Sequence, residues 1–268
     1  AASADQSRLR GHLEALVDLG CRRAGDGEVG EATARYLVDQ LSDLGITSER
    51  EEFELTPTRA VAINLLSKET GEESSLVLPG VYFSETASQS RVLRGLADSA
   101  GVSENVSGFS LSAGKTEPVR QIKVLATIRG TRFSERVLEL CAHHDTVPAT
   151  VGGDDNSTHV AVLLEVARLL QANPPACSVR LCFFAAEEIG LRGSAEHITR
   201  LRAADRLDEV FGLINLDSIG FLTDTGEFRS DRYHRPTDGL EGLHLENLQR
   251  VTAMVTAAAL EAALQAAE

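Results

Sequence analysis

Hydrophobic and polar positions along this chain follow two different periods. Apolar residues spaced three and four apart, as in amphipathic helices, occur in four segments: 7–19, 28–44, 157–170 and 246–266. Short apolar or alternating runs typical of strands occur at 51–55, 61–66, 122–128, 137–142, 179–185 and 210–216. The last two runs are apolar at nearly every position, which is expected of strands that are covered on both faces of a sheet.

Strands that alternate with helices predict an α/β fold. We expect a three-layer sandwich whose central sheet is mixed and largely parallel, with helices on both faces. Residues 67–118 are rich in Ser, Glu and Gly and show no clear period apart from a possible helix near 86–99. We interpret 67–118 as an elaborated connection inside a single domain that covers residues 1–268.

Composition narrows the possible functions only a little. A net charge of −14 argues against nucleic acid or an anionic membrane as a partner, and it is compatible with a site that attracts cations. No apolar run is long enough to predict a membrane-spanning helix. The segment AASADQSRLR at 1–10 is rich in small residues, as at the start of a processed precursor, so we expect a secreted or periplasmic protein.

The four cysteines form no CxxC pair, so a zinc ribbon is not predicted. Cys141 and Cys182 lie inside hydrophobic strand segments, where a cysteine behaves as a small apolar residue. Cys177 and Cys182 are near enough in sequence for a disulfide, but a strand would point them to opposite faces.

The stretch HHDTVPATVGGDDN at 143–156 places two histidines, three aspartates and an asparagine directly after an apolar strand. Like charges that are crowded together repel, and their burial is costly unless a positive charge accompanies them. A bound metal ion would resolve this conflict. The stretch therefore raises the question of whether the rest of the chain supplies further ligands.

Further polar clusters answer that question. Glu187-Glu188 follows the strand at 179–185, Asp217 follows the strand at 210–216, and the segment YHRPTD at 233–238 precedes the last helix. In open α/β sheets, ligands bind beyond the carboxyl ends of the strands, and the clusters at 143–145, Glu187-Glu188 and Asp217 are predicted to lie there. Each cluster alone is most simply a solvated surface feature, whereas their joint occurrence indicates one site.

Five stretches resemble the M28 family of co-catalytic zinc aminopeptidases, whose fold is shared with glutaminyl cyclases. They are AHHDTV, GGDDNSTHVAVLLEVARLL, FFAAEEIGLRGS, NLDSIG and YHRPTD, which occur in the family's order over residues 120–266. RRAGDGEVGEATARYLVDQLSDLGI also resembles the family's N-terminal helix.

The resemblance implies a role for each matched residue. It implies two zinc ions, one held by His143 and Asp217 and the other by Glu188 and His234, with Asp155 bridging both. Asp145 would orient His143, and Glu187 would be the general base for a water that the metals activate. Asp238 would support His234, and Asp154 would be structural. The implied substrates are peptides with free N-termini.

The chain departs from the family between Asp217 and His234, which are only 17 positions apart. The family has a longer, pocket-lining segment there, so the resemblance does not predict substrate preference. Two alternatives therefore stay open: a glutaminyl-cyclase-like acyltransferase that uses one metal ion, and a non-catalytic binding protein of the same fold. The sequence predicts no oligomeric state.

Overall fold

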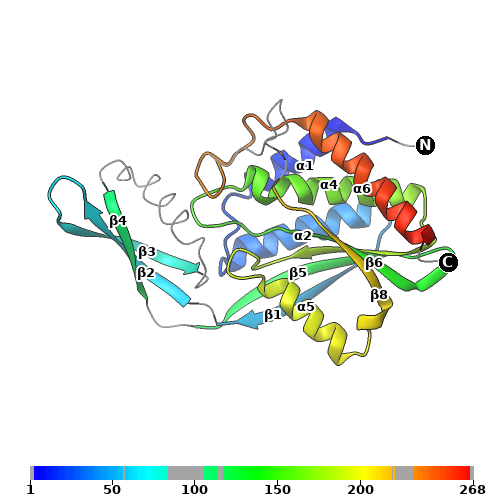
Figure 1. Cartoon of the computed structure of the whole chain (residues 1–268), viewed down its shortest axis with the longest axis horizontal. Helices are drawn as coiled ribbons and strands as arrows, with labels where there is room; N and C mark the ends of the chain where they lie inside the picture. The colour runs from blue at the N-terminus through cyan, green and yellow to red at the C-terminus, as the bar shows by residue number, and fades with distance from the viewer. Residues whose placement is uncertain are drawn as a thin grey trace.

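A five-stranded sheet with the order β1-β5-β7-β6-β8 forms the centre of the computed structural model, which describes residues 3–56, 58–83, 106–113, 117–218, 220 and 232–265 (Figure 1). Its strands are β1 (Ser48–Leu55), β5 (Val119–Ile128), β6 (Phe133–His143), β7 (Cys177–Phe184) and β8 (Val210–Asn215). β5 is antiparallel to both of its neighbours, whereas β6 is parallel to β7 and β8. The sheet is therefore mixed and largely parallel, as the sequence predicts.

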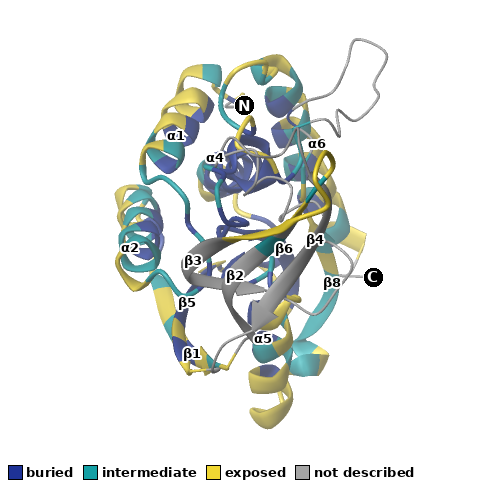
Figure 2. Cartoon of the chain, turned by 90° about the vertical axis from the view of Figure 1, so that its left-hand side faces the viewer, coloured by how far each residue is buried: buried dark blue, intermediate teal, exposed yellow. Residues whose placement is uncertain are grey.

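Helices cover both faces of this sheet. One face carries α1 (Gln6–Asp18), α2 (Gly27–Asp43), α4 (Thr158–Ala172) and α6 (Leu245–Gln265), and the other carries α5 (Arg192–Ala203) (Figure 1). Figure 2 shows α4 buried in the middle of its layer, while the outward sides of α1 and α2 are exposed. α4 packs against α1, α2 and α6, which explains why its sequence is apolar on nearly every side. The predicted three-layer α/β sandwich is confirmed.

Helix α5 was not predicted from the sequence. Its buried residues are only Gly193, His197 and Leu201, so it lacks a broad apolar stripe. The helix begins tightly against the end of β7, where a Cβ on Gly193 would lie 2.2 Å from the carbonyl oxygen of Ala185. Only a glycine fits that close approach.

The connection predicted at 67–118 contains regular structure. β2 (Thr58–Ser67), β3 (Glu73–Phe83) and β4 (Val106–Ala113) form a separate antiparallel sheet with the order β3-β2-β4. In Figure 1 this sheet projects from the main body beyond β1 and β5. The strand predicted at 61–66 is confirmed as part of β2, whereas the helix predicted near 86–99 lies outside the described residues. That residues 1–268 form one domain stays a prediction.

Helix α1 contributes a buried histidine, His12, that makes the free energy of unfolding depend on pH. Burial lowers the pKa of His12 from 6.5 to about 4, and His12 Nδ1 lies 2.8 Å from the Tyr36 hydroxyl. Between these two pKa values the unfolded chain holds a proton on His12 that the folded chain does not hold. Stability therefore rises with pH across this window and is lost as the pH falls from 6.5 towards 4.

We expect His12→Gln to reduce the slope of the free energy of unfolding against pH by up to about 1.4 kcal/mol per pH unit. Urea unfolding at a series of pH values between 4 and 6.5 measures the change. Tyr36→Phe is the matched variant, since it removes the hydroxyl partner but keeps His12 buried, and it should retain the slope. An equal slope in wild type and His12→Gln would show that His12 is not responsible.

Candidate metal centre

The parallel strands β6, β7 and β8 bring the predicted ligands to one edge of the sheet. His143 is the last residue of β6 and pairs with Phe184 at the end of β7. Glu187 and Glu188 follow three and four residues later, and Asp217 follows the end of β8. Because β6 lies between β7 and β8, its terminal histidine is flanked by the acidic residues that follow both neighbours.

Asp155 lies between the two histidines. His143 Nε2 is 3.1 Å from Asp155 Oδ1, and His234 Nε2 is 3.2 Å from Asp155 Oδ2. Each carboxylate oxygen of this one residue therefore faces a different imidazole. This is the arrangement expected of a carboxylate that bridges two ions.

The remaining predicted ligands complete two groups around Asp155. Asp217 Oδ1 lies 3.6 Å from His143 Nε2, and Glu188 Oε2 lies 3.2 Å from His234 Nε2. His143, Asp155, Glu188 and His234 are all largely buried, whereas the side chain of Asp217 is 43% exposed. The structure thus brings all five predicted ligands together.

Several of these donor atoms have no hydrogen-bond partner although they are buried. Among the described residues they include His143 Nε2, Asp155 Oδ1, Glu188 Oε1 and His234 Nε2. Buried polar atoms without a partner are rare and costly, so this set needs an explanation. A cation between the imidazoles and the carboxylates would satisfy them, and nitrogen and carboxylate oxygen ligands suit zinc. The residues present therefore fit the metal that the sequence implies.

The raised pKa values of the two histidines show that the surrounding carboxylates stabilise positive charge in this site. Burial alone would lower the pKa of His143, but contacts with Asp145, Asp155 and Asp217 hold it well above 6.5. Burial likewise opposes protonation of His234, yet Asp155 and Glu188 raise its pKa to about 10. The surrounding carboxylates thus favour a positive charge at the positions of both imidazoles.

Glu187 lies beside the ligand groups without joining either of them. Its Oε2 is 3.9 Å from His143 Nε2, and its side chain is 29% exposed. Burial raises its pKa to about 7, and the carboxylates of Asp145, Asp217 and Asp155 add to this effect, whereas His143 opposes it. A carboxyl group with a pKa near neutrality can both accept and return a proton.

Asp145 stabilises the site through both its backbone carbonyl group and its carboxylate. Its backbone carbonyl oxygen lies 3.0 Å from His143 Nδ1, closer than its carboxylate, which is 3.6 Å away. The carboxylate instead accepts hydrogen bonds from the backbone N–H groups of Glu187, at 3.0 Å, and Glu188, at 3.2 Å. One residue therefore orients the imidazole and fixes the loop that carries both glutamates.

Asp238 acts on a different residue from the one we predicted. Its carboxylate accepts hydrogen bonds from the backbone N–H groups of Asp154, at 2.8 Å, and Asp155, at 3.1 Å. His234 Nδ1 has no partner among the described residues. Asp238 thus supports the bridging aspartate, not His234. Asp154 accepts hydrogen bonds from the Gly220 backbone and from the Thr158 hydroxyl, as expected of a structural residue.

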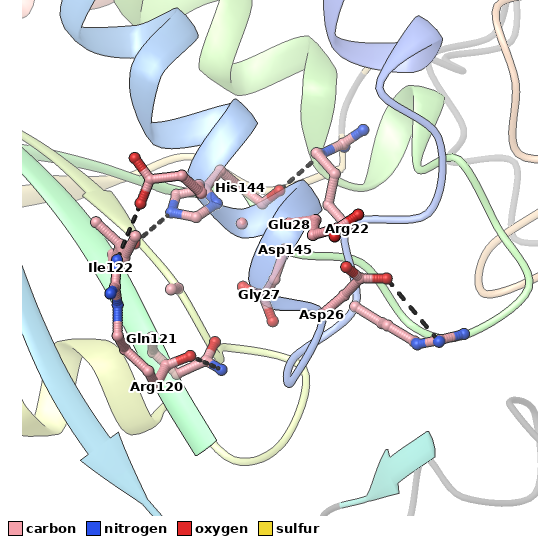
Figure 3. A pocket seen from close by; sticks show the side chains of 13 residues that line it. Arg22, Asp26, Gly27, Glu28, Arg120, Gln121, Ile122, His144 and Asp145 are labelled. Atoms are coloured by element: carbon pink, nitrogen blue, oxygen red, sulfur yellow. Dashed lines mark hydrogen bonds and ion pairs between the residues drawn. The ribbon is translucent and has the colours of Figure 1, made fainter. Parts of the chain in front are cut away.

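Arg22 is a supporting residue that the sequence did not reveal. Its buried guanidinium donates to the carbonyl oxygens of His144, at 2.7 Å, and Val151, at 2.9 Å, and to the Ser157 hydroxyl, at 2.8 Å. Burial lowers its pKa to about 10, so the group remains charged at neutral pH. Figure 3 shows Arg22 reaching the backbone of His144. One side chain thus ties the end of β6 to the loop that carries Asp155.

We expect Arg22→Met to lower the free energy of unfolding by about 3–5 kcal/mol, because it leaves several buried carbonyl oxygens without donors. Denaturant unfolding measures this loss. Arg10→Met, on the exposed side of α1, is the matched control and should change stability by less than about 0.5 kcal/mol. A loss below about 1 kcal/mol for Arg22→Met would mean that the loop holds its shape without this residue.

A pocket of about 330 Å³ lies next to Arg22 (Figure 3). Its lining includes Asp145 and His144 but none of the five predicted ligands. His144 Nε2 lies 2.9 Å from the carbonyl oxygen of Ile122, so this histidine packs against β5. The stretch 218–233, where the resemblance locates the substrate pocket, lies largely outside the described residues.

Comparison with known proteins confirms the resemblance to M28 peptidases. Residues 123–229 match the model described as Peptidase family M28. The matched range contains every predicted ligand except His234, which the structure nevertheless places against Asp155.

Two known proteins illustrate the similarity. This chain is 35% identical over 104 residues to "Aminopeptidase YwaD" of Bacillus subtilis, covering 38% of this chain and 22% of that protein. It is 33% identical over 118 residues to "Probable lipoprotein aminopeptidase LpqL" of Mycobacterium tuberculosis, covering 42% of this chain and 23% of that protein. The chain therefore spans about a quarter of the length of these relatives.

Solved structures show the same fold. A zinc aminopeptidase from Bacillus subtilis superposes with a TM-score of 0.72 at 16% identity, covering 98% of this chain and 96% of that one. A glutaminyl cyclase from Fimbriiglobus ruber superposes with a TM-score of 0.65 at 13% identity, covering 96% of this chain and 95% of that one. At such identities the likeness concerns the fold alone.

Proposed function

We propose that this chain is a zinc-dependent aminopeptidase that hydrolyses the N-terminal residue from peptides. The observation that carries the proposal is Asp155, whose two oxygens face the unpartnered Nε2 atoms of His143 and His234. Two zinc ions would be held there, one by His143, Asp155 and Asp217 and the other by Asp155, Glu188 and His234. Bound zinc would lower the pKa of a water molecule towards neutrality and polarise the scissile carbonyl group.

Glu187 is the proposed general base. It reaches the edge of the ligand groups, its side chain is partly open to solvent, and its pKa is raised to about 7 by burial and by neighbouring carboxylates. It would accept a proton from the attacking water and return it to the nitrogen of the leaving amine. Asp145 holds the backbone of Glu187, so the carboxylate stays aimed at the site.

The charge of the site supports a substrate with a free N-terminus. A peptide α-ammonium group is a cation, and an acidic protein surface attracts cations over long range. The net charge of −14 supports peptides rather than nucleic acid as partners. No helix in the described part of the chain has the length and apolar character needed to cross a membrane. The name of the Mycobacterium relative supports a secreted or periplasmic location.

The proposal is tested by hydrolysis of aminoacyl anilides with protein purified without chelators. We expect turnover that stops after treatment with a chelator and returns on addition of zinc, because the ligand set needs the cation. The N-acetylated anilide is the matched control and should not be cleaved, since it lacks the ammonium group. Turnover that survives complete zinc removal would overturn the metal-dependent mechanism.

A peptide with N-terminal glutamine separates the second activity of this fold from the first. An aminopeptidase releases free glutamine, whereas a glutaminyl cyclase produces a pyroglutamyl peptide without hydrolysis. Mass spectrometry distinguishes the products by the loss of one residue or the loss of ammonia. Loss of ammonia alone would replace hydrolysis by cyclisation as the function of the site.

A further inference from the structure

A second cluster of metal-ligating side chains lies on the face of the sheet that α5 covers. Glu139 and Cys141 are two positions apart on β6, so they share a face. Cys141 pairs in register with Cys182 on β7, and His197 reaches the same place from α5. All four residues are almost completely buried. None of them belongs to the metal centre described above.

The donor atoms of this cluster lie close together. One carboxylate oxygen of Glu139 and the Sγ atoms of Cys141 and Cys182 all lie within 4.8 Å of one another. His197 Nε2 is 2.9 Å from Glu139 Oε1, and the Cys182 thiol is within hydrogen-bond reach of both His197 and Cys141. Two sulfurs and one carboxylate oxygen therefore lie within reach of one another, and the His197 imidazole lies beside the carboxylate and the Cys182 thiol.

One atom of the cluster is left without a partner. Arg180 Nη1 lies 2.7 Å from Glu139 Oε1, the same oxygen that His197 contacts. Glu139 Oε2 is buried and has no hydrogen-bond partner in the described part of the chain. A buried carboxylate oxygen is costly to leave in this state, so the arrangement calls for a further positive group.

We propose that Cys141, Cys182, His197 and Glu139 bind one thiophilic divalent cation of the zinc class in tetrahedral geometry. Cysteine thiolates, histidine nitrogens and carboxylate oxygens are the ligands of zinc in proteins, and structural zinc ions take four of them. Thiolate ligands favour zinc over magnesium or calcium. The two thiols would release their protons to solvent on binding, and His197 would bind as the neutral imidazole.

Charge balance supports this assignment. The divalent cation carries two positive charges and Arg180 carries one, against two thiolates and the Glu139 carboxylate. The loaded cluster is therefore neutral, which a buried site requires. In the metal-free protein, burial and the neighbouring Cys141 hold the pKa of the Cys182 thiol well above 9.0, so this thiol stays protonated.

The surroundings of the cluster show how an ion could enter it and which elements the ion would connect. A pocket of about 350 Å³ is lined by His197, Arg180 and Leu125, so solvent reaches the edge of the cluster. A bound ion would join β6, β7 and α5 at a point only two residues before His143 on β6. We therefore infer a structural ion that braces the sheet next to the M28 metal centre.

Cobalt substitution tests this proposal, because thiolate ligands give Co²⁺ a charge-transfer band in the near ultraviolet. The M28 centre has only nitrogen and oxygen ligands, so the band would report the cysteine cluster alone. We expect the full chain loaded with Co²⁺ to show the band, and we expect Cys141→Ala and Cys182→Ala to lose it. Cys177→Ala, which removes an equally buried thiol outside the cluster, should retain it.

Zinc content gives a second readout. Cys182→Ala should hold one zinc ion per chain fewer than wild type, whereas Cys177→Ala should match wild type. Wild-type protein that binds Co²⁺ without a thiolate band would overturn the proposal even if the cysteine variants fail to fold. A band that persists in both Cys141→Ala and Cys182→Ala would overturn it as well, and so would a Cys141–Cys182 disulfide in the native protein.

Discussion

Glu187→Gln is expected to lower kcat for aminoacyl-anilide hydrolysis by about 10²–10⁴-fold, the usual contribution of general acid–base catalysis. Glutamine has nearly the same shape as glutamate but cannot accept a proton from water. Glu187 is not among the proposed zinc ligands, and its backbone is fixed by Asp145. Zinc content and the thermal unfolding temperature should therefore stay at their wild-type values.

The control is Glu14→Gln, on the exposed side of α1, where the same chemical change lies far from the site. It should leave kcat within a factor of about two, as surface substitutions do. Steady-state kinetics and metal analysis on the same preparations separate the outcomes. If Glu187→Gln retained more than a tenth of wild-type kcat, another group would have to be the base.

Asp155→Asn is the second change with a large expected effect. An amide offers one oxygen where the carboxylate offers two, so it cannot face both His143 and His234 as an acceptor. It also removes the negative charge between the two histidines. We expect the variant to lose at least one zinc ion per chain and about 10³-fold or more in kcat, since metal stabilisation of the transition state supplies several kcal/mol.

Asp154→Asn is the matched control, because it makes the same exchange at the adjacent buried aspartate. The Asp154 side chain contacts the Gly220 backbone and the Thr158 hydroxyl and lies outside both ligand groups. This variant should keep its zinc ions, as measured by plasma emission spectroscopy after gel filtration. Equal zinc content in Asp155→Asn and wild type would rule out a bridging role for Asp155.

The ligands were predictable because their positions follow from local rules. Residues after parallel strands meet at one edge of a sheet, so His143, Glu188 and Asp217 had to converge once their strands were recognised. Asp155 precedes a strongly apolar helix, which fixed its place relative to the sheet. The resemblance to M28 peptidases supplied the ligand role of each of these residues, and also of His234, which lies in a loop that no periodicity locates.

The supporting contacts were less predictable because they depend on tertiary geometry. Sequence alone does not show that the carboxylate of Asp145 turns to the backbone of Glu187, or that Asp238 reaches Asp155 and not His234. Arg22 is separated by more than 120 residues from the carbonyl group that it contacts at His144. Such contacts have no local signal in a single sequence.

Two elements of the fold escaped prediction for different reasons. Helix α5 buries a small residue and a histidine where most helices bury an apolar stripe. The helical period of apolar residues in its sequence is therefore weak. The sheet formed by β2, β3 and β4 includes segments rich in serine and glycine, which are poor strand formers. In both cases tertiary packing outweighs local propensity.

Anomalous X-ray diffraction at the zinc edge tests the central claim most directly, on crystals of protein purified without chelators. Around Asp155 we expect two peaks about 3.5–4 Å apart, one beside His143 and Asp217 and the other beside Glu188 and His234, with one oxygen of Asp155 on each. A single peak near Asp155, or none, from protein that cleaves aminoacyl anilides would contradict the two-metal account.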